Sequence, residues 1–172
     1  MAQDVNMEVI SFKTLWDNYP SESKPCPGDF SNQCAIRVSH ALLDSGVDFS
    51  SCPAVKCYGP AHNYLGKHVL RAEELAVWLN TMPVKGMKER VKLNPENFHN
   101  EIDGKTGIIF FKDYYTVGNQ QWENRSGDHI DLWNKNKTTG YLFRWSRAMW
   151  ETLAPDVSAW SKCREVWFWE LK

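Results

Sequence analysis

Residues 31–43 of the chain read SNQCAIRVSHALL. Three apolar residues of this stretch recur at helical spacing on one face: Ala35, Val38 and Leu42. Asn32 or Ser31 is expected to cap the helix, because a short polar side chain there can accept a hydrogen bond from a backbone N–H group. Gly46 is expected to end it in the left-handed conformation. The stretch therefore predicts a buried helix with Cys34 in its first turn.

Cys34 is expected to be a catalytic nucleophile because of its place in that turn. The unsatisfied N–H groups and the dipole at the start of a helix favour an anion. Such a position stabilises the thiolate, which is the reactive form of cysteine. The alternative is a small residue that packs inside the helix, since cysteine is among the most buried residue types.

Length and composition restrict the classes of protein. With 172 residues, 42% of them hydrophobic and 24% charged, the chain is expected to form one globular domain over residues 1–172. A formal net charge of -1 gives no basic field for a polyanion, so nucleic acid is not expected as a partner. No apolar stretch approaches the ~20 residues of a membrane helix, so no membrane insertion is expected. Nine Trp residues suit either a large core or a cleft that stacks on sugars or peptides.

The N-terminus and the cysteines bear on the compartment. Residues 1–8 lack a basic region followed by an apolar core, so a conventional signal peptide is not expected. If Cys34 remains a thiol, four cysteines are left that could pair in an oxidising compartment: Cys26, Cys52, Cys57 and Cys163. The sequence does not decide which of them form disulfides.

A zinc site is the less favoured interpretation of residues 50–62. This segment holds Cys52, Cys57 and His62, and His68 follows it. A structural zinc site usually has four ligands, with the cysteines in closely spaced pairs, and the segment lacks a second such pair. We therefore expect a disulfide or buried thiols here, and no metal and no cofactor in the site.

The order of the predicted elements indicates an α+β fold. Helices are expected first, around residues 12–16, 34–45 and 70–79. Strands are expected later, at residues 107–112, 129–133, 141–145 and 166–171. Residues 50–62 and 85–100 are interpreted as irregular connections, and residues 134–140 as a turn. Helices followed by strands favour an antiparallel sheet packed against helices.

His129 is the best placed of the five histidines to act as the base. It lies in a strand, on the face opposite Ile130 and Leu132. A sheet packed on the helix of Cys34 could bring its ring to the thiol, and histidine can both hold a thiolate and protonate a leaving amine. The alternative is a structural histidine at a strand edge.

Three segments together resemble the fourth family of type VI secretion amidase effectors. Residues 32–39, 104–112 and 127–134 read NQCAIRVS, GKTGIIFFK and GDHIDLWN. Members of that family are papain-like, NlpC-type cysteine peptidases that cut bacterial cell-wall peptides. The resemblance implies a papain-like fold, with N-terminal helices that carry Cys34 packed on an antiparallel sheet that carries His129. It also implies that Cys34 is the nucleophile and His129 the base.

The third catalytic residue departs from the family pattern. Family members carry an aspartate beyond the turn after the histidine strand, and the corresponding position here falls near Gly140, which has no side chain. An acceptor at the second ring nitrogen fixes the histidine tautomer and supports the imidazolium. Asp131 shares the face of His129 and is our candidate, while Asn134 and Asn136 in the turn remain open alternatives.

The resemblance further implies the substrate, the partners and the place of action. The expected bond joins D-glutamate to meso-diaminopimelate in the peptidoglycan stem peptide. Expected partners are that stem peptide, a cognate immunity protein that blocks the Cys34 cleft, and the type VI secretion machinery. The protein would be made in the cytoplasm, secreted by that machinery and active in the target-cell periplasm. The alternative is a non-catalytic module that binds cell-wall glycan or peptide in a Trp-rich cleft.

Overall fold

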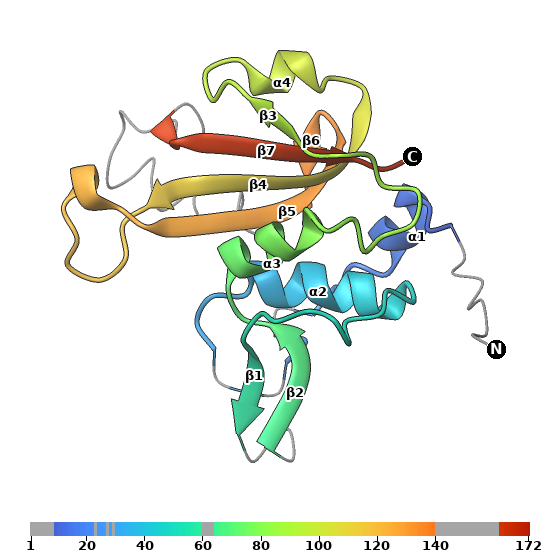
Figure 1. Cartoon of the computed structure of the whole chain (residues 1–172). Helices are drawn as coiled ribbons and strands as arrows, with labels where there is room; N and C mark the ends of the chain where they lie inside the picture. Colours follow the sequence, from blue (N-terminus) through green and yellow to red (C-terminus); the bar gives the residue numbers. More distant parts are fainter. Residues whose placement is uncertain (1–8, 23, 27, 29, 60–63, 140–161) are drawn as a thin grey trace.

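The computed structural model describes residues 9–139 and 162–172, apart from positions 23, 27, 29 and 60–63 (Figure 1). The strand expected at residues 141–145 lies outside the described residues. The described helices are α1 (Phe12–Asp17), α2 (Cys34–Asp44), α3 (Ala72–Leu79) and α4 (Phe98–Glu101), with a 3₁₀ turn, η2 (Trp122–Asn124). The described strands are β1 (Lys56–Gly59), β2 (Tyr64–Val69), β3 (Val91–Leu93), β4 (Lys105–Tyr115), β5 (Gly127–Lys135), β6 (Lys137–Thr138) and β7 (Glu165–Glu170).

The main sheet has five antiparallel strands in the order β3-β7-β4-β5-β6. Strand β4 lies at its centre and pairs with β5 on one side and β7 on the other, so that Phe111 faces His129 across the β4–β5 pair. The helices α1, α2 and α3 lie on one side of this sheet and α4 on the other (Figure 1). This arrangement confirms the predicted α+β class with an antiparallel sheet.

Side chains bury both faces of the sheet. Ile108, Phe110 and Ile130 lie in the core shared with the residues of α1, α2 and α3. Ile109 and Phe111 point the other way, into a second core with Phe98 of α4. Because successive residues of a strand alternate between faces, the unbroken apolar run in β4 supplies both cores. The expected alternation in β5 is confirmed in the same way.

Two segments that were interpreted as irregular contain regular structure. Strands β1 and β2 form an antiparallel hairpin within residues 56–69, so the irregular reading of residues 50–62 is wrong from Lys56 to Gly59. The connecting segment 85–100 contains β3, which pairs with β7 at the edge of the main sheet, and the start of α4. Strands β1 and β3 are short. Val91 and Lys92 of β3 are also exposed, so the apolar pattern that marks a buried strand is absent there.

The start of α2 differs from the predicted cap. Gln33 is the N-cap residue and makes no side-chain capping bond. Asn32 does not cap the helix, because its side chain accepts a hydrogen bond from the Cys34 thiol and donates one to the Tyr115 hydroxyl. The predicted end is confirmed, since Gly46 has a φ of 87° just beyond Asp44.

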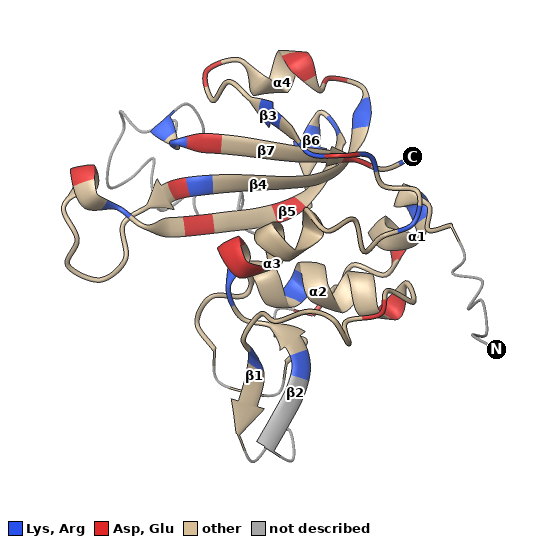
Figure 2. Ribbon diagram, viewed as in Figure 1, with Lys and Arg blue, Asp and Glu red and all other residues tan. Residues whose placement is uncertain are grey.

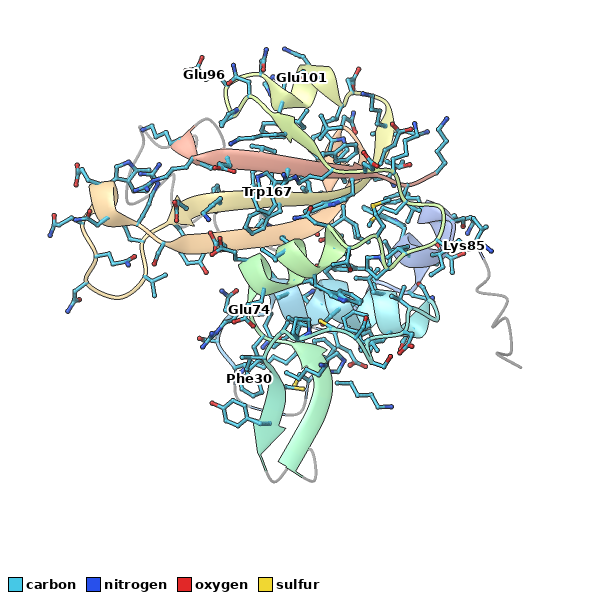
Figure 3. The ribbon with its side chains drawn as sticks, viewed as in Figure 1. Phe30, Glu74, Lys85, Glu96, Glu101 and Trp167 are labelled. Carbon is cyan, nitrogen blue, oxygen red and sulfur yellow. The ribbon has the colours of Figure 1, made fainter. Side chains whose placement is uncertain are left out.

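Acidic and basic residues are interspersed along the described ribbon and do not separate by sign (Figure 2). No described helix is both long and apolar enough to cross a membrane. Four described tryptophans are buried: Trp78, Trp133, Trp167 and Trp169. Trp167 lies on β7, and the guanidinium of Arg90 sits 4.3 Å from the centre of its ring (Figure 3). These four rings are therefore part of the buried core.

Candidate active site

Cys34 is the first residue of α2, and its side chain is buried. Its Sγ lies 3.3 Å from Oδ1 of Asn32 and 3.9 Å from the backbone oxygen of Asp128, the residue before His129. The first backbone N–H groups of a helix have no partner inside that helix. The thiol thus sits between the positive end of α2 and the start of β5.

His129 enters this site from β5 and is held between aromatic rings. Its imidazole stacks on the ring of Phe111, with ring centres 6.2 Å apart and an angle of 13° between the planes. On another side it packs against the ring of Tyr114, with ring centres 6.0 Å apart. Burial lowers the pKa of His129, but polar contacts with the Asp131 carboxylate and with Cys34 outweigh burial and raise that pKa to about 9. The ring and the thiol therefore lie within polar contact of each other, and the contacts with Cys34 and Asp131 favour the protonated form of the imidazole.

Asp131 lies beside the same ring, two residues further along β5. Its Oδ2 is 3.7 Å from Nε2 of His129, which is an ion-pair contact and longer than a direct hydrogen bond. Its Oδ1 accepts hydrogen bonds from the Leu132 backbone N–H at 2.8 Å and from the Thr139 hydroxyl at 2.7 Å. Since Nε2 faces Asp131, Nδ1 is the ring nitrogen left for Cys34. The three predicted residues form one buried cluster.

The two asparagines that were alternatives for the third role lie elsewhere. Asn134 pairs with Thr106 and with Lys137 near the far end of β5. It is five residues from His129, which corresponds to about 17 Å along a strand. Asn136 follows it and is exposed. Gly140, at the position where the family has its aspartate, lies outside the described residues.

Sequence reasoning missed the residues that surround Asp131. Thr139 holds the carboxylate through the hydrogen bond given above, and it also bonds to the hydroxyl of Tyr19. Burial, followed by the charge of Asp131, raises the pKa of Tyr19, so that its phenol stays protonated. The only signal in the sequence is the place of Thr139 just after β6, in the turn that follows the histidine strand.

Arg37 connects this network to α2, one turn after Cys34. Its side chain is buried and donates to the Tyr19 hydroxyl at 3.3 Å. It also donates to the backbone oxygens of Pro20 at 2.7 Å and Glu22 at 2.5 Å. Arg37 thereby fixes the chain after α1 against the helix that carries the thiol.

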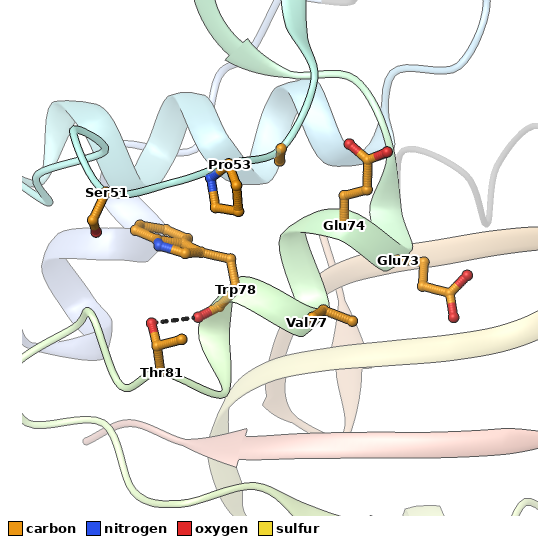
Figure 4. A pocket seen from close by; sticks show the side chains of 8 residues that line it. Ser51, Pro53, Glu73, Glu74, Val77, Trp78 and Thr81 are labelled. Atoms are coloured by element: carbon orange, nitrogen blue, oxygen red, sulfur yellow. Dashed lines mark hydrogen bonds between the residues drawn. The ribbon is translucent and has the colours of Figure 1, made fainter.

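A cavity of about 570 Å³ lies between α3 and residues 51–54 (Figure 4). Trp78 and Val77 supply much of its apolar wall, and Glu73 and Glu74 lie at its side. The Thr81 hydroxyl donates to the backbone oxygen of Trp78 at 2.8 Å. Neither the thiol of Cys34 nor the ring of His129 lines it, so this cavity is distinct from the candidate active site.

One family model matches most of the chain. A family model described as "Type VI secretion system (T6SS), amidase effector protein 4" (Tae4) matches residues 30–169. The comparison with curated protein sequences finds no match.

Three solved structures share the fold. A chain in the structure of the effector–immunity system Tae4/Tai4 from Salmonella typhimurium has 20% identity and a TM-score of 0.59, over 96% of this chain and 100% of that one. The effector Tae4 from Enterobacter cloacae has 19% identity and a TM-score of 0.59, over 96% and 98%. A chain in the complex of Salmonella typhimurium Tae4 with Enterobacter cloacae Tai4 has 23% identity and a TM-score of 0.52, over 75% and 83%.

The family match begins just before α2 and ends within β7, so it contains Cys34, His129 and Asp131. Since it covers well over half of the 172 residues, the chain belongs to the family of type VI secretion system amidase effector protein 4.

Proposed function

We propose that this chain, as a single catalytic domain, cleaves the amide bond between D-glutamate and meso-diaminopimelate in peptidoglycan stem peptides, with Cys34 as the nucleophile. The observation that carries the proposal is the buried cluster of Cys34, His129 and Asp131, which two distant segments bring together. Membership of an amidase effector family supports hydrolysis of an amide. The choice of bond rests on the family resemblance of the three sequence motifs.

The geometry suits a papain-like reaction. A protonated imidazole beside a cysteine stabilises its thiolate, and the raised pKa of His129 keeps that proton in place at neutral pH. The thiolate of Cys34 attacks the amide carbonyl, and backbone N–H groups at the start of α2 stabilise the oxyanion. His129 gives its proton to the leaving amine of diaminopimelate, which leaves a thioester on Cys34.

Water completes the cycle. His129, now neutral, takes a proton from a water molecule that attacks the thioester. The D-glutamyl carboxylate leaves, and the thiolate–imidazolium pair forms again. The carboxylate of Asp131 lies beside Nε2 of His129, so it orients the imidazole and stabilises the imidazolium. No step needs a metal or a cofactor.

We further propose that the chain acts as an antibacterial effector. The type VI secretion machinery would deliver it to the periplasm of a target cell, and a cognate immunity protein would bind over the Cys34 cleft to protect the producer. Support comes from the family description and from solved relatives whose titles name an immunity protein, Tai4. Expression directed to a bacterial periplasm should then lyse cells, whereas cytoplasmic expression should be tolerated. Toxicity confined to the cytoplasm would point to another target.

Digestion of purified peptidoglycan tests the proposed reaction. The wild type should release fragments that end in D-glutamate, together with fragments that begin with diaminopimelate, as identified by mass spectrometry. Cys34→Ala and His129→Ala should release neither. Cys52→Ala is the matched control, because Cys52 is also buried but lies outside the cluster. Cleavage by Cys34→Ala at the wild-type rate would refute the proposal. New reducing sugar ends would indicate a glycosidase, and binding of peptidoglycan by the wild type without cleavage would indicate a binding module.

A further inference from the structure

A second cluster of reactive side chains packs against α2 and shares no residue with the candidate active site. Cys26 comes from the segment before α2, Cys57 from β1 and His68 from β2. One ligand atom of each, two Sγ and one ring nitrogen, all lie within 4.8 Å of one another. We propose that these three residues bind a zinc ion.

The distances fit a tetrahedral metal site. With Zn–S near 2.3 Å and Zn–N near 2.0–2.1 Å, a tetrahedral angle places a sulfur and a nitrogen ligand about 3.6 Å apart. Sγ of Cys57 and Nδ1 of His68 are 3.8 Å apart. Two thiolates and one imidazole form a donor set that suits zinc. The fourth position of the tetrahedron would be filled by a water molecule or by another group.

Residues behind His68 hold its ring in the orientation that a metal needs. Nε2 of His68 lies 3.0 Å from Nδ1 of His40, and Nε2 of His40 lies 3.2 Å from the Asp44 carboxylate. These distances allow the carboxylate to accept the Nε2–H of His40, and Nδ1 of His40 to accept the Nε2–H of His68. In that tautomer, Nδ1 of His68 presents its lone pair on the side of the two sulfurs. Metal-binding histidines commonly donate their second ring nitrogen in this way.

A disulfide would account for less of this arrangement. A bond between Cys26 and Cys57 would use both sulfurs, but it would leave no role for His68 or for the hydrogen-bonded chain behind it. No disulfide joins any of the five cysteines, all of which are described. When zinc binds, the two thiols lose their protons to the solvent, so the site forms without an oxidant.

The position of the site assigns it a structural role. Cys26 and Cys57 pack with Ile36 of α2, together with Phe30 and Leu70. Phe30 lies beside β1, where its ring packs against that of Tyr58 with ring centres 5.6 Å apart (Figure 3). A bound zinc ion would therefore join the β1–β2 hairpin to the segment that leads into Cys34. The ion takes no part in the proposed reaction, and the inference stands independently of it.

Metal binding by the purified full-length protein tests the proposal. Titration against a chromophoric zinc chelator should give one zinc per chain for the wild type, and removal of the ion should lower the melting temperature. Cys26→Ser, Cys57→Ser and His68→Ala should lose this binding. The matched controls Cys52→Ser and Cys34→Ala should keep it. Circular dichroism would check that each variant folds.

A second variant keeps the test valid if the buried cysteines do not tolerate serine. His40→Ala removes the support behind His68 without removing a ligand, and it should weaken zinc binding by about 10- to 100-fold, as loss of such outer partners does. The cobalt-substituted wild type should show a thiolate-to-cobalt charge-transfer band. The proposal would be overturned if the wild type bound no stoichiometric zinc, or if both His40→Ala and His68→Ala kept the wild-type affinity. A Cys26–Cys57 disulfide in protein from a zinc-supplemented reducing cytoplasm would also overturn it.

Discussion

Replacement of Asp131 by asparagine tests how the proposed base is supported. The substitution removes a negative charge 3.7 Å from Nε2 of His129 and keeps an oxygen that can accept the hydrogen bonds from Leu132 and Thr139. Opposite charges about 4 Å apart attract by about 4 kcal/mol at the effective dielectric of a protein site. Each 1.4 kcal/mol corresponds to about a tenfold change in rate. We therefore expect kcat to fall by about 10²- to 10³-fold.

The assay would follow release of diaminopimelate-containing fragments from a soluble disaccharide tetrapeptide by liquid chromatography. Thermal melting would check that Asp131→Asn folds like the wild type. Asn134→Ala and Asn136→Ala serve as controls at the far end of β5, and both should remain active. If Asp131→Asn stays near wild-type activity while one of the asparagine variants collapses, Asp131 is structural and the reasoning is wrong.

Three further predictions concern the surroundings of the site. Thr139→Val removes the hydroxyl that holds Asp131 and should lower kcat by about tenfold, with rescue by Thr139→Ser in the same assay. The folded-state pKa of His129, about 9, exceeds the ordinary value of 6.5. The protonated ring should therefore contribute fully to stability below about pH 6.5, and this contribution should be lost as the pH rises toward 9. Melting curves of the wild type and His129→Gln across this pH range would measure it. Arg37→Lys cannot reproduce the bonds to Tyr19 and to the two backbone oxygens, and urea denaturation should show a loss of about 1–3 kcal/mol.

The parts of the site that lie on strongly patterned elements could be predicted from the sequence. The helical spacing of the apolar residues in 35–42 placed Cys34 at the start of α2, because such spacing is typical of a helix with one buried face and not of a strand. The alternation in residues 129–133 placed His129 and Asp131 on one face of β5. Local periodicity was enough for these assignments, since both elements pack directly against the core.

Elements and contacts that depend on distant partners could not be predicted in this way. β3 has exposed residues and is held by pairing with β7, more than 70 residues later in the chain. Asn32 has the right side chain for a cap, but its Oδ1 accepts a hydrogen bond from the Cys34 thiol, while its amide N–H donates to Tyr115 from the distant strand β4. Thr139 gains its role only because β6 folds back beside β5 and brings it to Asp131. Cys26 lies beside Cys57 and His68 only because the β1–β2 hairpin brings those two residues together.

Intact-protein mass spectrometry of a rapidly quenched reaction tests directly whether Cys34 is the nucleophile. The enzyme would be mixed with disaccharide tetrapeptide and stopped in acid, which preserves a thioester. We expect a transient adduct with the mass of the disaccharide–L-alanyl–D-glutamyl acyl group, mapped by proteolysis to Cys34. The adduct should be absent in Cys34→Ala, while Cys52→Ala should form it normally. An adduct on another residue, or continued release of diaminopimelate fragments by Cys34→Ala, would contradict the account.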